Sequence, residues 1–304
     1  MKNINYSIII PHKNTPDLLL RLLGSIPRRE DLEIIIVDDN SSADVVDFKV
    51  FPGRDEERVT CIFNKQENKG AGHARNCGMA VATGMWLLFA DSDDLYDQSA
   101  FLDTIDRHLN SDADIIYFGV DCVYSDDVSR KCDERQVVQK LQRYYRDFKA
   151  GVDGAEHNIR FNFTEPWAKM IRRELVQNHR IQFDEVQVCN DYFFSVMTGH
   201  YARKIDVDST KLYVLTHRPG SLSHGYADTY EKLETRIDVA LNVAEFFREH
   251  KVRAEIPQLR VLVVLLIKRY PKYFFRTFAK IGARGVSRMA LIRDVCFSMI
   301  GKVA

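Results

Sequence analysis

The chain has 304 residues, 45% of them hydrophobic and 28% charged, and its net charge is zero. This is the composition of an ordinary soluble protein, and no run reaches the roughly 18 consecutive apolar residues of a membrane span. The six cysteines are scattered without a C-x-x-C pair, which argues against a zinc ribbon or a disulfide framework and suits reduced thiols. The N-terminal MKNINYSIIIPHKN has only a short apolar run before a proline, so we expect no signal peptide and a cytoplasmic protein.

The first forty residues predict a strand, a helix and a second strand. Residues 6–11 and 32–39 are continuous apolar runs rich in Ile and Val, which is typical of buried parallel strands. Between them, Thr15 can cap a helix, Pro16 suits its first turn, and the following leucines have helical spacing. Such a unit closes right-handed onto a parallel sheet.

Later segments continue this alternation. The sequence predicts strands at 59–63, 85–90 and 113–120, and a helix that begins in the glycine-rich turn GAGHARNCG and ends at Gly84. Other expected elements, in chain order, are a helix at 99–110, a polar excursion at 121–160, a short strand with a helix at 165–183, a helix at 190–201, the strand and turn of KLYVLTHRPGSLSH, and helices from about 227 onward.

Two predicted strands end in carboxylates. Asp38 and Asp39 end the second strand, and LLFADSDD places Asp91, Asp93 and Asp94 directly after another. Because ligands of open α/β sheets bind outside the carboxyl ends of the strands, both groups should meet in one crevice. A D-x-D turn suits a hard divalent cation that keeps sites for water and phosphate, whereas the alternative is a solvated loop with a helix cap. We expect the counter-charge of this cluster to be a divalent cation bound with a diphosphate, not a side chain.

The segment NKGAGHARNCG resembles a phosphate-binding loop, although it fits neither common glycine motif. Its glycines allow close approach to a ligand, and the N-terminus of a helix favours an anion. Arg75 could clamp a nucleotide or form an ion pair with Asp91, and Asn76 could support buried backbone.

Seven segments together resemble the family 2 glycosyltransferases, enzymes of the GT-A fold that are common in bacterial polysaccharide synthesis. The segments occur in the family's order and spacing over about residues 5–225: SIIIPHKN, EIIIVDDNSS, NKGAGHARNCGMAVATG, LLFADSDDLY, PWAKMIRREL, NDYFF and HRPGSLS. The resemblance implies an α/β GT-A domain, a Rossmann-like mixed sheet flanked by helices, at 1–225. Within it, 1–100 would bind the nucleotide sugar and 101–225 would form the acceptor side. A basic helical region would follow at 226–304.

The resemblance also implies an inverting, metal-dependent transfer from a nucleoside-diphosphate sugar, by family habit UDP, to a saccharide or lipid-linked saccharide. Asp39 would bind the nucleobase beside Asp38, while Asp91 and Asp93 would hold ribose, diphosphate and Mn²⁺ or Mg²⁺. Asp191 would deprotonate the acceptor hydroxyl, with a helix N-cap as its alternative role. Asp94 and Asp97 would only shape the turn. Further donor contacts are expected from Pro11, Lys13, Gly70, Arg75, Asn76, Ser92, His217 and Arg218.

Two positions depart from the family pattern. Lys13 stands where relatives often have an aromatic residue for stacking on the base, and Asn190 replaces the usual Glu before the expected catalytic Asp. These departures leave open how the nucleobase is contacted and how the side chain of Asp191 is held and its pKa set. Trp167 and Lys169 could line the acceptor site, with a core tryptophan as the alternative.

Residues 251–304 carry twelve Lys or Arg against two acids, a charge near +10 that is balanced by an acidic body. With its apolar stripes, this tail predicts basic amphipathic helices on an anionic membrane surface. The alternatives are an oligomerisation surface or a helical cap on the catalytic domain.

Two other functions stay open. A sugar-nucleotide pyrophosphorylase shares this sheet type but has a glycine-rich basic N-terminal signature that is absent here. A non-catalytic sugar-nucleotide or glycan-binding protein would not need Asp91, Asp93 and Asp191 together. We expect no nucleic-acid partner, because the body is acidic and has no recognition motif. The sequence does not identify the sugar, the acceptor or the linkage.

Overall fold

The computed structural model describes residues 3–64, 70–132, 136–218, 229–253, 256–289 and 291–293. The chain divides into two compact units, residues 1–219 and 220–304. The domain boundary expected near residue 225 lies in the stretch 219–228, outside the described residues.

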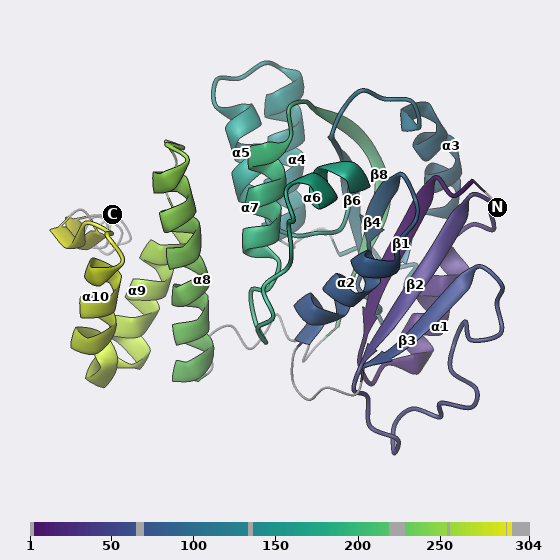
Figure 1. Ribbon diagram of the computed structural model, residues 1–304, viewed down its shortest axis with the longest axis horizontal. Helices are drawn as coiled ribbons and strands as arrows, with labels where there is room; N and C mark the ends of the chain where they lie inside the picture. The colour runs from purple at the N-terminus through teal and green to yellow at the C-terminus, as the bar shows by residue number, and fades with distance from the viewer. Residues whose placement is uncertain are drawn as a thin grey trace. The chain divides into compact units, whose positions relative to one another are not determined.

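A mixed sheet forms the centre of the first unit (Figure 1). Its described strands have the order β3-β2-β1-β4-β7-β6-β8-β5. Strands β1 to β4 are mutually parallel, β7 runs antiparallel to β4 and β6, and β8 runs parallel to β6. The bounds are β1 (Tyr6–His12), β2 (Leu32–Asp39), β3 (Val59–Asn64), β4 (Trp86–Phe89), β5 (Leu95–Tyr96), β6 (Ile115–Tyr124), β7 (Lys169–Arg172) and β8 (Ile205–His217).

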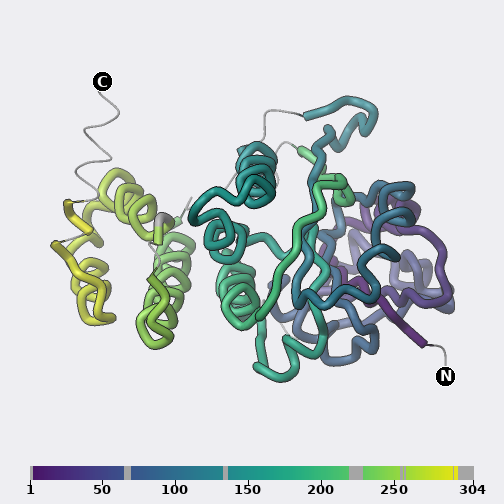
Figure 2. The backbone as a smooth tube through the Cα atoms, turned by 90° about the horizontal axis from the view of Figure 1, so that it is seen from above, coloured from purple at the N-terminus to yellow at the C-terminus, as the bar shows by residue number. Residues whose placement is uncertain are grey.

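Helices pack on this sheet, with α2 lying across β1 and β2 (Figures 1 and 2). The helices of the first unit are α1 (Pro16–Ser25), α2 (Gly70–Val81), α3 (Gln98–His108), α4 (Gln136–Lys149), α5 (Ala155–Asn162), α6 (Arg173–Asn178) and α7 (Tyr192–Tyr201). The parallel strands predicted from apolar runs are confirmed, since β1 is buried along its whole length and β2 along nearly all of it.

The expected polar excursion at 121–160 is partly wrong. Strand β6 continues to Tyr124, and the rest of the segment contains α4 and α5. One face of α4 buries Val138, Leu141 and Tyr145 against the unit's core, while its remaining positions are mostly charged or polar. Most residues of α4 are charged or polar, so the overall composition of 121–160 does not show that its few apolar residues have the spacing of an amphipathic helix.

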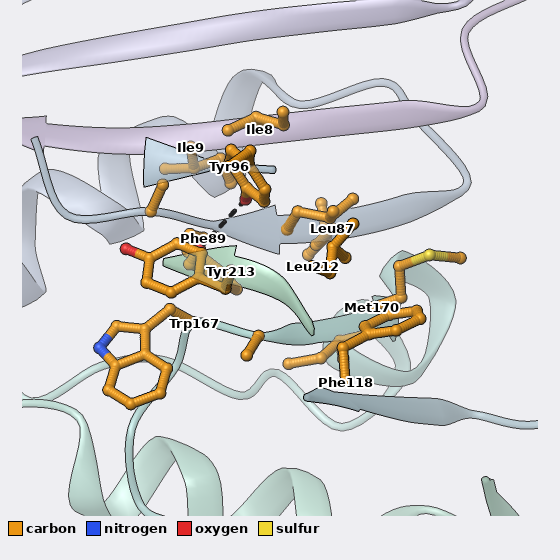
Figure 3. Packing of buried hydrophobic residues seen from close by; sticks show 14 of the residues in the cluster. Ile8, Ile9, Leu87, Phe89, Tyr96, Phe118, Trp167, Met170, Leu212 and Tyr213 are labelled. Atoms are coloured by element: carbon orange, nitrogen blue, oxygen red, sulfur yellow. Dashed lines mark hydrogen bonds between the residues drawn. The ribbon is translucent and has the colours of Figure 1, made fainter. Parts of the chain in front are cut away.

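The core reaches the carboxyl ends of the central strands through a group of aromatic side chains (Figure 3). Trp167 stacks on Tyr213 with ring centroids 5.4 Å apart and planes 4° from parallel, and Tyr96 meets Tyr213 edge-on at 5.3 Å. Trp167 is 6% exposed. It therefore takes the alternative role of a core tryptophan, and its suggested place in an acceptor site is not supported.

The second unit is helical and has its own apolar core. It contains α8 (Tyr230–Glu249), α9 (Pro257–Arg269), the short 3₁₀ helix η2 (Pro271–Tyr273) and α10 (Phe274–Ala283). Leu233, Ile237, Leu262, Leu266 and Ile281 are buried together. Among the residues that are described, no helix combines the length and the apolar character needed to cross a membrane.

Candidate active site

Asp38 is the last residue but one of β2, and its side chain binds the loop that follows the strand. Its Oδ1 lies 2.8 Å from His12 Nδ1 and accepts a hydrogen bond from Ser41 Oγ at 2.5 Å, while its Oδ2 accepts the Ser41 N–H at 2.9 Å. Burial alone would raise the pKa of Asp38, but these hydrogen bonds from His12 and Ser41 lower it below its ordinary value. Asp38 is thus an ionised carboxylate that holds the loop in place.

Asp39, beside it, is buried and incompletely partnered. Its Oδ2 is 3.7 Å from Lys13 Nζ, while its Oδ1 is buried with no hydrogen-bond partner among the described residues. Burial raises the pKa of Asp39, and electrostatic effects of Lys13 and His73 offset part of this rise. A buried oxygen of this kind is costly unless a ligand N–H or hydroxyl binds it, which is the requirement for the predicted base contact.

The turn after β4 is fixed by contacts to β8. The Asp91 N–H donates to Tyr213 Oη at 2.9 Å, and Tyr213 Oη donates to Asp94 Oδ2 at 2.9 Å. Asp94 Oδ1 accepts the Thr216 N–H at 2.7 Å. Burial, with the charges of Asp93 and Asp91, raises the pKa of Asp94 well above its ordinary value. Asp94 shapes the turn, as expected, and Asp97 caps α3 by accepting the Ala100 N–H at 2.9 Å.

Arginines supply counter-charge to this acidic turn. Asp91 Oδ1 accepts a hydrogen bond from Arg75 Nη2 at 2.6 Å, and Asp93 Oδ2 lies 3.8 Å from Arg218 Nη2. The expectation that no side chain balances the cluster was therefore wrong. Burial and the charge of Asp91 still raise the pKa of Asp93, although Arg218 and Arg21 lower it in part. The arginines therefore offset the repulsion between the neighbouring carboxylates of Asp91 and Asp93 only in part.

Two neighbouring carboxylates that still repel each other suit a divalent cation. In the part of the chain that the structure describes, no group of three or more His, Cys, Asp or Glu side chains forms a metal site. Asp91 and Asp93 would therefore supply at most a partial ligand set. Mg²⁺ and similar hard ions are often bound in this way, with water and substrate phosphates completing the coordination. The donor set fits such a metal.

Arg75 joins two parts of the site, at Asp91 and Asn190, that lie far apart in the sequence. It is 4% exposed, and its Nη1 donates to Asn190 Oδ1 at 2.9 Å while Nη2 reaches Asp91. Its guanidinium carbon lies 5.3 Å from the centre of the Phe183 ring. Asn76 strengthens the same connection, because its side-chain amide exchanges hydrogen bonds of 3.0 and 2.9 Å with the Phe183 backbone. Its expected donor contact stays a prediction.

Glycines allow α2 to lie against the segment 183–190. A Cβ atom on Gly72 would stand 2.1 Å from the carbonyl oxygen of Asp184. Gly70 has φ +75°, and a Cβ there would meet Val186 O at 2.9 Å. The glycine-rich turn therefore serves backbone packing, and its expected phosphate contact at Gly70 stays a prediction.

Replacing Gly72 with Ala should displace the segment 183–190 and lower the free energy of unfolding by about 1–3 kcal/mol, as overpacking commonly does. Gly24→Ala is the matched control, because Gly24 is also helical but no atom of the described residues lies within 4 Å of its added Cβ. Urea unfolding of both variants measures the difference. Equal stability of the two variants would contradict this account of the packing.

Asp191 directly precedes α7 and makes no side-chain capping bond there. Burial raises its pKa to about 6, with a lowering effect from Arg75 and raising effects from Glu165 and Asp91. A carboxylate with that pKa is suited to accept a proton near neutral pH. Sequence reasoning set aside Asp184, whose pKa burial also raises to about 6, and whose Oδ2 is buried without a partner in the described structure.

The remaining predicted residues lie around the same strand ends. Pro11 is buried in β1 opposite Val37, and Ser92 Oγ is 3.1 Å from Thr15 Oγ1. His217 ends β8 with its ring against Tyr124. Lys169 is buried, and its Nζ donates to Phe163 O at 2.8 Å and to Ser195 Oγ at 3.3 Å. Burial lowers the pKa of Lys169 to about 7, so this side chain is an interior amine and does not line an open acceptor surface.

Comparison with known sequences identifies relatives. The sequence model "Glycosyl transferase family 2" matches residues 7–180. The chain is 26% identical over 214 residues to the putative glycosyltransferase EpsH of Bacillus subtilis, covering 68% of this chain and 59% of that protein. It is 26% identical over 220 residues to a poly(ribitol-phosphate) beta-glucosyltransferase of Bacillus spizizenii, covering 70% and 32%. It is also 26% identical over 292 residues to the glycosyltransferase GlyG of Streptococcus pneumoniae, covering 87% of each. The first two matches therefore span less than two thirds of those relatives.

Solved structures agree on the fold. S. aureus TarS 1–349 in complex with UDP-GlcNAc gives a TM-score of 0.59 at 19% identity, covering 89% of this chain and 73% of that one. The mannosyltransferase PcManGT from Pyrobaculum calidifontis, in complex with GDP-Man and Mn²⁺, gives 0.52 at 16% identity, covering 97% and 80%. The predicted GT-A fold is confirmed. The family model covers more than half of the sequence, and the chain therefore belongs to glycosyl transferase family 2.

Proposed function

We propose that this protein is an inverting, metal-dependent glycosyltransferase that moves a sugar from a nucleoside-diphosphate donor to a saccharide or lipid-linked saccharide in cell-surface polysaccharide synthesis. The observation that carries the proposal is the position of Arg75, which binds both Asp91 of the D-x-D turn and Asn190, the neighbour of Asp191. A donor-binding carboxylate and a candidate base thus belong to one connected site.

The donor half lies at the ends of β2 and β4. The Oδ1 of Asp39, which has no partner in the described part of the chain, would accept a base N–H, with Lys13 as its counter-ion. Asp91 and Asp93 would hold Mn²⁺ or Mg²⁺, which when bound stabilises negative charge on the departing diphosphate. Arg218, near Asp93, would contact the same phosphates. UDP is the preferred donor nucleotide, since TarS is described in complex with UDP-GlcNAc.

Asp191 would act on the acceptor. As the acceptor hydroxyl oxygen bonds to the anomeric carbon, its proton passes to the Asp191 carboxylate and the bond to the diphosphate breaks. One displacement from the face opposite the leaving group inverts the anomeric centre. The raised pKa of Asp191 makes its carboxylate a competent proton acceptor near neutrality.

A donor panel tests the proposal. The intact protein is mixed with nucleoside-diphosphate sugars and Mn²⁺, and thermal unfolding and release of nucleoside diphosphate are measured. Bound donor at 100 times its Kd should stabilise the fold by about 2.7 kcal/mol. Release of pyrophosphate from a nucleoside triphosphate would instead support a pyrophosphorylase. Binding without turnover in the presence of saccharide acceptors would support a sugar-nucleotide-binding protein.

Replacing Asp93 with Asn should weaken Mn²⁺-dependent binding of UDP by about tenfold or more, because a neutral amide is a poorer ligand for a hard cation. Calorimetry of UDP binding with and without Mn²⁺ measures this effect, and binding without metal should change little. Asp97→Asn is the matched control from the same turn, since Asn also caps a helix. A metal dependence that survives Asp93→Asn would refute the assignment.

The second unit is proposed to contact an anionic membrane at the inner face of the plasma membrane. Some of its cations are paired internally, since Lys280 and Arg284 bind Asp238 and Glu245 of α8. Others are exposed and have no acidic partner among the described residues: Arg253, Arg260, Lys268, Arg269, Lys272 and Arg288. Phe275, next to this basic stretch, is 84% exposed. Exposed cations beside an exposed aromatic ring complement an anionic lipid surface.

Replacing both Arg269 and Lys272 with Glu should weaken binding to phosphatidylglycerol-containing vesicles by at least about tenfold, because each basic residue near such a surface contributes roughly 1 kcal/mol. Cosedimentation with these vesicles and with neutral phosphatidylcholine vesicles measures the effect. Arg146→Glu, at an exposed cation of the first unit, is the control. Unchanged cosedimentation of the double variant would remove the membrane proposal and leave an oligomerisation surface or a helical cap as the alternatives.

A further inference from the structure

A thiol and an imidazole of α2 form a chain of contacts with a carboxylate from another segment, and the proposed transfer reaction uses none of the three. His73 Nε2 is 3.5 Å from Cys77 Sγ, and His73 Nδ1 is 2.7 Å from Glu185 Oε1. His73 and Cys77 are four residues apart on one helix, which places them on the same face. Glu185 comes from the segment between α6 and α7, more than one hundred residues away.

The order of these groups determines their chemistry. A carboxylate accepts hydrogen bonds, so Glu185 favours the tautomer of His73 in which Nδ1 carries the proton. The lone pair of Nε2 then faces the thiol. This is the arrangement of nucleophile, base and orienting group by which proteins activate a cysteine. The opposite ring nitrogens of His73 serve the two partners, so the three groups form a relay and do not surround one metal position.

We propose that Cys77 is a nucleophilic thiol and a site of covalent modification by soft electrophiles, in particular low-molecular-weight disulfides. Cys77 Sγ–H gives its proton to His73 Nε2, and the thiolate attacks one sulfur of the disulfide. The new S–S bond forms as the old one breaks, and the departing thiolate takes the proton from the imidazolium.

The position of Cys77 gives such a modification a structural consequence. Glu185 lies in the same segment as Phe183 and Asn190, which Asn76 and Arg75 of α2 hold in place. A group added to Cys77 would therefore stand at the junction between α2 and this segment. The proposal itself concerns the reactivity of the thiol and does not depend on sugar transfer.

Iodoacetamide labelling of the intact protein at neutral pH tests the proposal, with each cysteine quantified by peptide mass spectrometry. Cys61 is the internal reference, because it is also partly buried, burial raises its pKa, and no histidine contacts it in the described structure. Cys77 should react at least about tenfold faster than Cys61, since an adjacent imidazolium raises the thiolate fraction. Glutathione disulfide should give the same order of reactivity.

His73→Gln should slow labelling of Cys77 by about tenfold and leave Cys61 unchanged. Glu185→Gln provides a second variant if His73→Gln does not fold, because the Glu185 side chain is 41% exposed and tolerates substitution; it should slow Cys77 by a smaller factor. The proposal is overturned if Cys77 reacts no faster than Cys61. It is equally overturned if the folded variants label Cys77 at the rate of the unchanged protein.

Discussion

Replacing Asp191 with Asn is expected to lower the rate of sugar transfer by about 10²–10⁴-fold, the usual contribution of a positioned general base. Asn has nearly the same shape but cannot accept the proton of the acceptor hydroxyl. Asp191 makes no side-chain capping bond to α7, and burial disfavours its charged form, so the substitution should not destabilise the fold at neutral pH. Steady-state kinetics with donor and acceptor, together with calorimetry of donor binding, separate the two effects.

The pH dependence of the transfer rate tests the role of Asp191 independently. The base must be ionised, and burial raises the pKa of Asp191 to about 6. The transfer rate should therefore reach its maximum above that pH and fall as the pH drops through about 6. In Asp191→Asn this acidic limb should disappear from the residual activity.

Asp184 provides the matched control, since burial raises its pKa to the same value of about 6. Asp184 differs because no charge from Arg75 or Asp91 contributes to its shift, whereas both contribute to that of Asp191. We expect Asp184→Asn to keep the acidic limb and most of the activity. If Asp184→Asn lost more activity than Asp191→Asn, the assignment of the base would have to be exchanged.

The sequence predicted those helices and strands whose pattern lies within one continuous segment of the chain. Strands β1 and β2 are continuous apolar runs, and α1 follows a capping threonine and a proline, so local pattern is sufficient for each. Helix α4 was missed because its charged face outnumbers its buried one, although Val138, Leu141 and Tyr145 have helical spacing. The two-residue strand β5 is too short to leave a periodic signal.

For the site, sequence supplied the residue types but not their partners. That Asp94 shapes the turn was predictable, whereas its contacts with Tyr213 and Thr216 join positions about 120 residues apart. The pairing of Arg75 with Asp91 could be named as one alternative, but its second contact to Asn190 depends on the three-dimensional fold. Such pairings follow from sheet order and helix placement, which no local pattern contains.

Removing Arg75 should have a large effect on both stability and transfer. Its side chain is buried, and Arg75→Ala deletes two charge-assisted hydrogen bonds, which should lower the free energy of unfolding by about 3 kcal/mol. Arg75→Lys keeps the charge but cannot reach Asp91 and Asn190 with two separate nitrogens, so it should recover only part of that loss. Urea unfolding of the three proteins measures the series. A fully stable Arg75→Lys would show that charge alone matters.

A double-mutant cycle asks whether Arg75 connects the donor turn to the segment of Asp191. Arg75→Ala and Asn190→Ala each break the 2.9 Å bond between these residues, so the double variant cannot lose it twice. If that bond positions Asp191, the losses in transfer rate should be non-additive, and the double variant should be about as slow as Arg75→Ala alone. Strictly additive losses would mean that Arg75 acts only through Asp91. Non-additivity in transfer rate, with donor affinity unchanged by Asn190→Ala, would establish that the carboxylate turn and the base are held by one side chain.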